Sequence, residues 1–251
     1  MKKFVEQDFK MRFDTDVNIQ NQGYILKRYS TNVCIVGARG FIGKHISKYF
    51  PGATLVDRSN FHLVFERSYE LIINCAAVGG SRMKKDTDDV YHENINTFTN
   101  IYHNAKYNKM IWFSSGASSL DTPYGRSKKY IEDLVKDDPR VYVLKIWGCF
   151  GPDEPDYRLL ATAKRTGHVT IEKDRLFDYV HVARVTQTVF VLIESEFQQP
   201  RCIHMCYKDK YLLSEIVKMA GYTCTVLSKD IGDPYIGSPM LSGTLQEDLK
   251  M

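Results

Sequence analysis

Residues 33 to 43 are Val33-Cys34-Ile35-Val36-Gly37-Ala38-Arg39-Gly40-Phe41-Ile42-Gly43. The first four form a short, continuous apolar run, which is typical of a strand buried on both faces. Three glycines follow, and a helix-like pattern continues through Tyr49. Glycine permits a tight turn and lets the backbone approach a pyrophosphate, and a helix N-terminus offers free N–H groups. The stretch therefore predicts a strand, turn and helix that bind a dinucleotide; a glycine-rich turn without a ligand is the alternative.

Short apolar runs of the same kind recur along the first 150 residues. They lie at 54–56, 71–77, 111–113 and 141–146, and helix patterns lie between several of them, the clearest at 88–105. This alternation predicts an α/β fold over residues 31–150, a Rossmann-like, doubly wound parallel sheet. We expect residues 151–251 to form a small C-terminal substrate-binding lobe with elements that return to the core. Residues 1–30 are interpreted as an N-terminal extension without assignable chemistry.

The composition is that of an ordinary globular protein. Of the 251 residues, 43% are hydrophobic and 25% charged, and the net charge of +4 is too small and too dispersed to indicate a nucleic-acid partner. No apolar run approaches the roughly 18 residues that span a bilayer, and the first residues lack the apolar core of a signal peptide. We therefore expect a cytoplasmic protein without a membrane partner.

The six cysteines are spread through apolar segments, which favours buried thiols over a disulfide framework. The run Cys202-Ile203-His204-Met205-Cys206 contains three residue types that bind metals. Its alternation is typical of a strand, and no second ligand cluster accompanies it. We therefore expect no metal site.

A phenol and an ammonium group lie four residues apart at Tyr124 and Lys128, downstream of an apolar run that ends in Ser114-Ser115. Residues at this spacing share a helix face, so the lysine can lower the pKa of the phenol. A nearby serine hydroxyl would complete a proton-transfer site. The pair alone is more typical of an exposed helix face, but the glycine-rich stretch upstream favours a catalytic interpretation.

The end of the second strand should meet the adenosine ribose of a dinucleotide, and it presents Asp57 and Arg58. A carboxylate there favours a free 2′-hydroxyl, whereas an arginine favours a 2′-phosphate. Arg39 in the glycine loop is a second guanidinium that could reach the same phosphate. The pattern favours NADP(H) and leaves NAD(H) open; a surface ion pair between Asp57 and Arg58 is the alternative.

In order and content, the motifs from Val33 to Ala220 resemble the extended short-chain dehydrogenase/reductase family, which includes nucleotide-sugar epimerases, dehydratases and reductases. Details that resemble GDP-fucose synthase and related reductases are Arg39, the short link from Arg58 to Leu71 without an obvious helix, and residues 77–80. The matching motifs are Gly37–Gly43, Asn74-Cys75-Ala76-Ala77, Asn94, Phe113-Ser114-Ser115, Tyr124–Lys128, Gly148–Pro152 and Phe177–Val182.

The resemblance implies a role for each catalytic candidate. Tyr124 would exchange a proton with a sugar carbonyl or hydroxyl, and Lys128 would lower the tyrosine pKa and bind the nicotinamide ribose. Ser115 would hold the substrate oxygen, with Ser114 as the fallback, and Asn94 would support a water that relays protons to Lys128. The implied cofactor-binding residues are Gly37, Arg39, Gly40, Phe41, Ile42, Gly43, Asp57, Arg58, Ala76, Ala77, Tyr124 and Lys128. The implied substrate wall is Val78, Gly79, Gly80 and Ser81.

Three departures from the family pattern narrow the expected activity. Gly116 stands where GDP-fucose synthase has its catalytic cysteine, and no histidine occurs between Gly151 and Arg165. Ser115 and Tyr124 are only nine residues apart, which predicts a more open site. We therefore expect an NAD(P)H-dependent oxidoreductase, best described as a 4-keto-sugar reductase acting on a nucleotide-linked sugar. The alternatives are a catalytically idle dinucleotide-binding sensor or scaffold and an NAD-dependent sugar epimerase. Relatives often dimerise through the Tyr-Lys helix, so a homodimer is the expected assembly if the chain has one.

Overall fold

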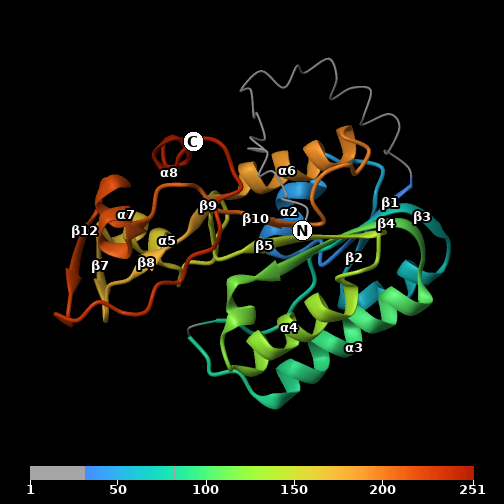
Figure 1. Ribbon diagram of the computed structural model, residues 1–251, viewed down its shortest axis with the longest axis horizontal. Helices are drawn as coiled ribbons and strands as arrows, with labels where there is room; N and C mark the ends of the chain where they lie inside the picture. Colours follow the sequence, from blue (N-terminus) through green and yellow to red (C-terminus); the bar gives the residue numbers. More distant parts are fainter. Residues whose placement is uncertain (1–31, 82) are drawn as a thin grey trace, which may run out of the picture.

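A computed structural model describes residues 32–81 and 83–251, so the expected N-terminal extension, residues 1–30, lies outside the described residues (Figure 1). Its centre is a six-stranded sheet in the order β10-β5-β4-β3-β1-β2, and every pairing is parallel. The strands are β1 Val33–Val36, β2 Thr54–Val56, β3 Ser68–Asn74, β4 Lys106–Ser115, β5 Val141–Ile146 and β10 Cys202–His204. The order reverses direction at β1, which makes the crevice beside this strand the expected ligand site of a doubly wound sheet. The α/β prediction is confirmed.

Helices cover both faces of this sheet (Figure 1). On one face α3 (Asp88–Asn104) packs against α4 (Pro123–Val135), and on the other α2 (Phe41–Ser47) packs against α6 (Val182–Glu194). Successive residues of β1 point to opposite faces, so Cys34 and Val36 join the α3/α4 core while Val33 and Ile35 join the other core. The continuous apolar run at 33–36 is thus explained by burial on both sides.

The remaining elements form a lobe of small two-stranded sheets. In them β6 (Gly148–Phe150) pairs with β9 (Tyr179–His181), β7 (His168–Ile171) with β12 (Thr223–Val226), and β8 (Leu176–Phe177) with β11 (Tyr211–Leu212). The helices of this part are α5 (Leu159–Thr166), α7 (Leu213–Met219) and α8 (Leu245–Asp248). The strand β10 returns from this part of the chain to the main sheet.

A buried carboxylate fastens the C-terminal helix to the lobe. Asp248 accepts hydrogen bonds from the backbone N–H of His181 at 2.9 Å, from Arg184 at 3.3 Å and from the Tyr207 hydroxyl at 2.5 Å. Burying a carboxylate is unfavourable unless its oxygens are paired, and here three donors satisfy it. His181 also accepts the N–H of Ala183 at the start of α6. His181 therefore contributes to the structure, through its backbone N–H and through its ring.

Several sequence expectations differ from the structure. The link after Arg58 is not free of helix, because residues Arg58–Phe65 form a 3-10 helix (η1) that Asp57 caps. All six cysteines are free thiols, but Cys202 is exposed, so the expectation of burial is wrong there.

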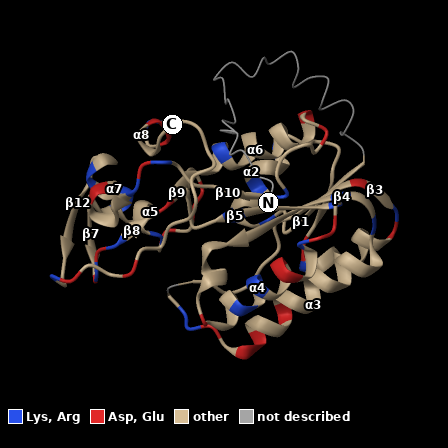
Figure 2. Cartoon of the chain, viewed as in Figure 1, with Lys and Arg blue, Asp and Glu red and all other residues tan. Residues whose placement is uncertain are grey.

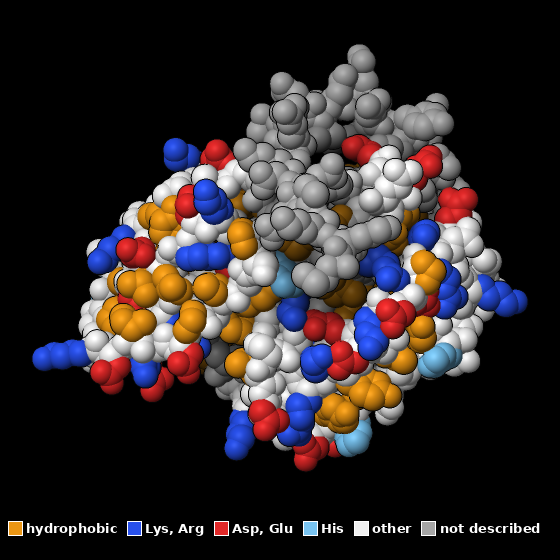
Figure 3. Space-filling view, viewed as in Figure 1, with side chains coloured by type: hydrophobic (Ala, Val, Ile, Leu, Met, Phe, Trp, Pro, Cys, Tyr) orange, Lys and Arg blue, Asp and Glu red, His pale blue; other side chains and the backbone are white. Residues whose placement is uncertain are grey.

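Positive and negative side chains are interspersed along the chain and over the face shown in Figures 2 and 3. No helix in the described part of the chain is long and apolar enough to cross a membrane.

Candidate active site

The glycine loop lies where the sheet order reverses, against the end of β3. Gly37 has a φ of +77°, and a Cβ atom on it would come within 2.7 Å of the backbone nitrogen of Ala76. A Cβ on Gly43 would come within 2.2 Å of the Gly37 carbonyl oxygen. Only glycine fits at these two positions, because a side chain would collide with backbone rather than with a movable group. The close packing of α2 on the loop therefore depends on both residues.

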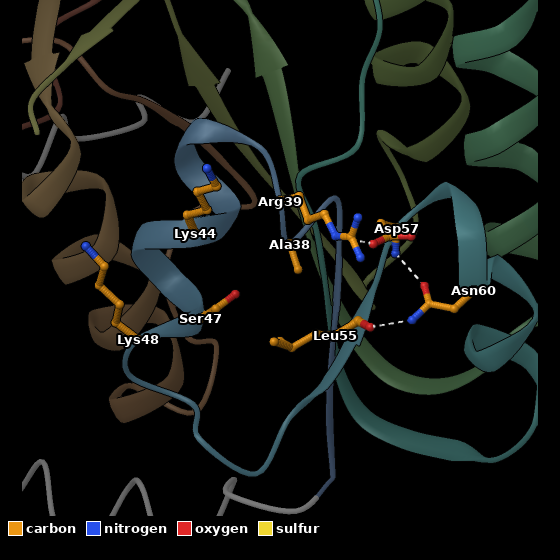
Figure 4. Close-up of a pocket in the computed structure, with 8 residues that line it drawn as sticks. All are labelled: Ala38, Arg39, Lys44, Ser47, Lys48, Leu55, Asp57 and Asn60. Atoms are coloured by element: carbon orange, nitrogen blue, oxygen red, sulfur yellow. Dashed lines mark hydrogen bonds and ion pairs between the residues drawn. The ribbon is translucent and has the colours of Figure 1, made fainter. Parts of the chain in front are cut away.

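A cavity of about 470 Å³ opens between α2 and β2, beside this loop (Figure 4). That volume lies within the range of pockets that hold small-molecule ligands. The residues that line it are Ala38, Arg39, Lys44, Ser47, Lys48, Leu55, Asp57 and Asn60. Three of these side chains are cationic and one is anionic, so the cavity suits an anionic ligand. A glycine loop at the start of a helix, beside such a cavity, is where a doubly wound sheet can accept the phosphates of a dinucleotide.

Asp57 is held at the mouth of the cavity as a carboxylate. It accepts hydrogen bonds from the Ser59 hydroxyl at 2.6 Å and the Ser59 N–H at 2.7 Å, and these bonds lower its pKa. Arg39 pairs with it at 2.6 Å (Figure 4) and contributes to the same shift. Arg58 pairs with Glu93 at 2.8 Å, so the Asp57–Arg58 surface pair considered from the sequence is wrong. Both arginine side chains are 80% exposed and can turn toward a ligand at little cost.

Tyr124 lies in the first turn of α4, which follows the end of β4 at Ser115 after a short link. The helix begins with Thr122 as its N-cap, whose hydroxyl accepts the Gly125 N–H at 3.0 Å, and with Pro123 at its first position. Between strand and helix the chain makes only the short 3-10 helix η2 (Gly116–Ser119). This short link brings the hydroxyls of Ser115 and Tyr124 together at the carboxyl end of β4.

The tyrosine is protonated at neutral pH in this arrangement. Burial raises the pKa of Tyr124 to about 12, and a hydrogen bond from Ser115 only partly offsets the rise. The Lys128 ammonium lies 5.5 Å from the centre of the Tyr124 ring and donates instead to the Phe113 carbonyl at 2.8 Å. The expectation that the lysine lowers the tyrosine pKa is therefore not met here: the desolvation effect is larger. Tyr124 is poised to donate a proton rather than to accept one.

Lys128 is one of the few buried cations in the described part of the chain, with 2% of its surface exposed. Burial lowers its pKa to about 8, while the charges of Glu132 and Cys75 act in the opposite direction. The ammonium also lies 4.8 Å from the centre of the Trp112 ring, a cation–π distance. The lysine is therefore still mostly charged at neutral pH and lies one helical turn behind Tyr124.

Asn94 pins the turn that follows β3. Its amide donates to the Val78 carbonyl at 3.0 Å and accepts the Val78 N–H at 2.9 Å, and it also donates to the Ser127 hydroxyl at 3.2 Å. These bonds use both N–H groups and the oxygen of the amide, so Asn94 holds the backbone at Val78, in the expected substrate wall, in place. The role in a water relay that the family resemblance implies stays a prediction.

The expected substrate wall lies directly against Tyr124. Gly79 and Gly80 have φ values of +80° and +70°, and a Cβ on Gly80 would come within 2.8 Å of the Tyr124 ring. The Gly80 N–H donates to Asp86 at 2.9 Å, which fixes the turn. Glycine is needed here both for the left-handed conformation and for the close approach of the ring.

The two serines at the end of β4 point in opposite directions, as neighbours on a strand do. Ser114 donates to Glu132 at 2.5 Å on the α4 side, whereas the Ser115 hydroxyl accepts the Ala117 N–H at 3.2 Å and lies beside Tyr124. The structure therefore brings Ser115 to the tyrosine and leaves the fallback, Ser114, outside the site.

Glu132 joins the elements behind the site. In addition to Ser114 it accepts hydrogen bonds from Ser118 at 3.2 Å and from Lys145 of β5 at 3.1 Å. The Lys145 and Glu132 side chains are 15% and 18% exposed, so each depends on the other for its charge balance. The carboxylate thus ties β4, η2 and β5 to the helix that carries Tyr124.

Replacing Glu132 by glutamine is expected to lower the free energy of unfolding by about 3 kcal/mol, because it leaves Lys145 largely buried without a counter-charge. The measurement is urea denaturation followed by circular dichroism. The matched control is Asp133→Asn on the same helix, whose pair with Lys129 is exposed on both sides and should contribute less than about 1 kcal/mol. Equal effects of the two substitutions would refute this account of Glu132.

Position 116 cannot carry a side chain. A Cβ on Gly116 would come within 2.3 Å of the Trp147 ring, and a Cβ on Gly237 would approach the same ring as closely. The absence of a cysteine here is therefore a packing consequence of Trp147.

No group of three or more His, Cys, Asp or Glu side chains within the described residues is arranged to hold a metal ion.

Tyr235 is the site residue that the sequence did not indicate. Its hydroxyl lies 3.5 Å from the Ser115 hydroxyl, 120 positions away along the chain. It comes from the irregular segment between β12 and α8, where no periodic pattern or motif marks a residue. The expectation of a more open site, based on the short link after Ser115, is incomplete because this segment approaches the same space.

No family model matches the sequence, and no curated protein sequence matches it significantly. Solved structures do match. A dTDP-4-dehydrorhamnose reductase from Bacillus anthracis in complex with NADP is 18% identical, with a TM-score of 0.67 over 87% of this chain and 95% of that chain. The GDP-mannoheptose C4 reductase of Campylobacter jejuni, with NADP bound, is 13% identical, with a TM-score of 0.65 over 88% and 96% of the two chains.

A third match is MoeE5 in complex with UDP-glucuronic acid and NAD, 18% identical, with a TM-score of 0.67 over 87% of this chain and 96% of that chain. The two reductases are described with NADP, whereas MoeE5 is described with NAD and a nucleotide sugar. At such low identity the likeness concerns the fold. Over nearly all of its described length, the chain has the α/β fold of nucleotide-sugar reductases and related NAD(P)-binding proteins.

Proposed function

We propose that this protein is an NADP(H)-dependent oxidoreductase of the extended short-chain dehydrogenase/reductase family that reduces a keto group of a nucleotide-linked sugar. The observation that carries the proposal is the position of a protonated Tyr124 beside Ser115, with Lys128 one turn behind, at the edge of the sheet where the glycine loop lies. A bound NADPH would supply a hydride to the carbonyl carbon. The cavity and loop beside α2 fit such a molecule.

The side chains of this site suit carbonyl reduction. Ser115 is placed to hold the carbonyl oxygen, and Tyr124 to donate the proton that this oxygen needs when the carbon gains a hydride. Lys128 remains charged near the ring, so it would stabilise the phenolate that the proton leaves behind. The pKa of about 12 favours the donor form of Tyr124, which is the form that reduction uses.

Reduction is favoured over epimerisation by the packing at Gly116. Epimerisation needs a second acid or base on the sugar, and Trp147 excludes a side chain at the position where GDP-fucose synthase has its cysteine. The direct test is incubation with NADPH and a panel of dTDP-, GDP- and UDP-linked 4-keto-sugars, following the loss of NADPH absorbance and the product. If NADPH raises the melting temperature and no sugar of the panel is reduced, the dinucleotide-sensor alternative replaces this proposal.

The preference for NADP(H) is supported by the charge of the adenosine-side cavity. Arg39, Lys44 and Lys48 line it against a single carboxylate, Asp57. Asp57 keeps its two bonds from Ser59 whether or not Arg39 is present, so Arg39 can move to a 2′-phosphate without leaving the carboxylate unpaired.

Replacing Arg39 by alanine is expected to weaken NADPH binding about tenfold and to leave NADH binding nearly unchanged, because a guanidinium–phosphate contact is made only to the former. Isothermal titration with each nucleotide measures the two affinities. Arg201→Ala, a change at an exposed site on the far side of the sheet from β2, is the control. An equal loss for NADPH and NADH would argue against a 2′-phosphate contact.

A further inference from the structure

The segment between β12 and α8, residues 227–244, runs from the lobe back toward the main sheet (Figure 1). It brings Tyr235 to the end of β4 at Ser115. The Tyr235 hydroxyl lies 3.5 Å from the Ser115 hydroxyl. It is also close enough to Tyr124 that a negative charge on Tyr235 would raise the pKa of Tyr124. Ser115 therefore lies between two phenols, of which only Tyr124 belongs to the motif found in the sequence.

The position of Tyr235 is fixed by its backbone. Its N–H donates to the Leu176 carbonyl at 2.9 Å, and its own carbonyl accepts the Asp178 N–H at 3.1 Å, so both of its backbone polar groups are bonded to residues 176–178. Its ring packs against Phe177, with the ring centres 5.1 Å apart.

Two residues later the same segment is anchored again. The Gly237 N–H donates at 2.7 Å to Asp178, a buried carboxylate that also pairs with Lys210 at 2.7 Å. A side chain whose backbone and ring are held in this way loses little further freedom when it binds a ligand, which is the property of a preorganised site.

The contact between Tyr235 and Ser115 is loose. At 3.5 Å it lies at the outer limit of a hydrogen bond and contributes little by itself. A ligand oxygen placed between the two hydroxyls would replace one long contact by two shorter ones. Hydrogen bonds of catalytic groups are often long before the substrate binds, and they tighten in the complex.

We propose that Tyr235 is a third catalytic hydroxyl of the reduction site, which donates a hydrogen bond to the reacting carbonyl oxygen together with Ser115 and Tyr124. This inference rests on the proposed reductase function. Negative charge develops on that oxygen as the carbon accepts a hydride, so a fixed donor stabilises the transition state more than the ground state. Tyr124 gives its proton to the oxygen, whereas Tyr235 keeps its own.

Burial raises the pKa of Tyr235, so its hydroxyl is a donor throughout the neutral range. A purely structural role would require the hydroxyl only as a cover over Ser115. These two roles differ in their effect on kcat at saturating substrate, because a cover contributes to stability and a transition-state donor contributes to rate.

The test is Tyr235→Phe, which removes the hydroxyl and keeps the ring that packs on Phe177. We expect kcat to fall on the order of tenfold to a hundredfold with little change in KM, and the melting temperature to stay within a few degrees of the wild type. Tyr211→Phe is the matched control, because Tyr211 lies on β11, paired with the other edge of Phe177, and should leave both constants unchanged.

The outcomes separate this inference from the function on which it rests. An active wild type with an equally active Tyr235→Phe variant would overturn the role of Tyr235 and leave the reductase proposal intact. A fall in kcat matched by a large loss of thermal stability would also overturn it, in favour of the structural role. A wild type that reduces no nucleotide-linked keto-sugar would overturn the proposed function itself, and with it the role of Tyr235.

Discussion

Replacing Tyr124 by phenylalanine is expected to lower kcat on the order of 10³-fold while NADPH binding is retained. The substitution removes the proton donor and keeps the ring that packs against Gly80. A positioned general acid contributes roughly 10²- to 10⁴-fold to the rate. The loss should be large here because, in the proposed mechanism, Tyr124 is the hydroxyl that gives its proton to the substrate oxygen. The measurement is NADPH oxidation with a keto-sugar substrate, with NADPH affinity determined separately.

Tyr130→Phe is the matched control for this prediction. Tyr130 lies on the same helix and is 46% exposed, so we expect its hydroxyl to have no role in the site. Its loss should leave kcat within a factor of about two. Retained turnover in Tyr124→Phe would contradict the proposed mechanism even if the protein proves to be a reductase.

Replacing Lys128 by methionine is expected to lower kcat on the order of 10²-fold and, at neutral pH, to stabilise the fold. The charge of Lys128 is buried at a cost that the shift of its pKa from 10.5 to about 8 reports, roughly 3 kcal/mol at neutral pH. Methionine fills a similar volume without that charge, although the hydrogen bond to the Phe113 carbonyl is lost. Activity and stability should therefore change in opposite directions.

The stability difference between Lys128→Met and the wild type should depend on pH in a defined direction. The pKa of Lys128 is lower in the folded than in the unfolded chain, so between about pH 8 and 10.5 the unfolded chain binds more protons and the wild type gains stability as the pH rises. The advantage of Lys128→Met should therefore be largest near neutral pH and shrink as the pH approaches 10.5. Urea denaturation at several pH values measures it, with Lys129→Met as the exposed control. A difference that is constant with pH would contradict a buried, charged Lys128.

Local sequence patterns were sufficient to predict the first strand, the glycine turn and the helix face that carries Tyr124 and Lys128. The run at 33–36 predicted a strand because it is buried on both faces, and the glycines predicted the turn because backbone lies within van der Waals reach of Gly37 and Gly43. The spacing of Tyr124 and Lys128 predicted a shared helix face, which the structure contains. In each case the signal lies within a few residues, even where the contact that requires it is distant, as between Gly37 and Ala76.

The features that the sequence did not predict depend on contacts between distant segments. The high pKa of Tyr124 follows from burial, which a four-residue spacing does not reveal. The orientation of Ser114 toward Glu132 depends on where β4 ends. Tyr235 is brought to Ser115 by hydrogen bonds to β8, and its own segment has no regular pattern.

The most direct test of hydride transfer to a sugar carbonyl uses NADPH that carries deuterium at the transferred position, with a nucleotide-linked 4-keto-sugar. We predict that mass spectrometry and proton NMR of the product will show one deuterium at C4 of the sugar, and that Tyr124→Phe will nearly abolish its formation. Oxidation of NADPH without deuterium in the sugar, or nucleotide binding with no turnover of any keto-sugar tested, would contradict the account.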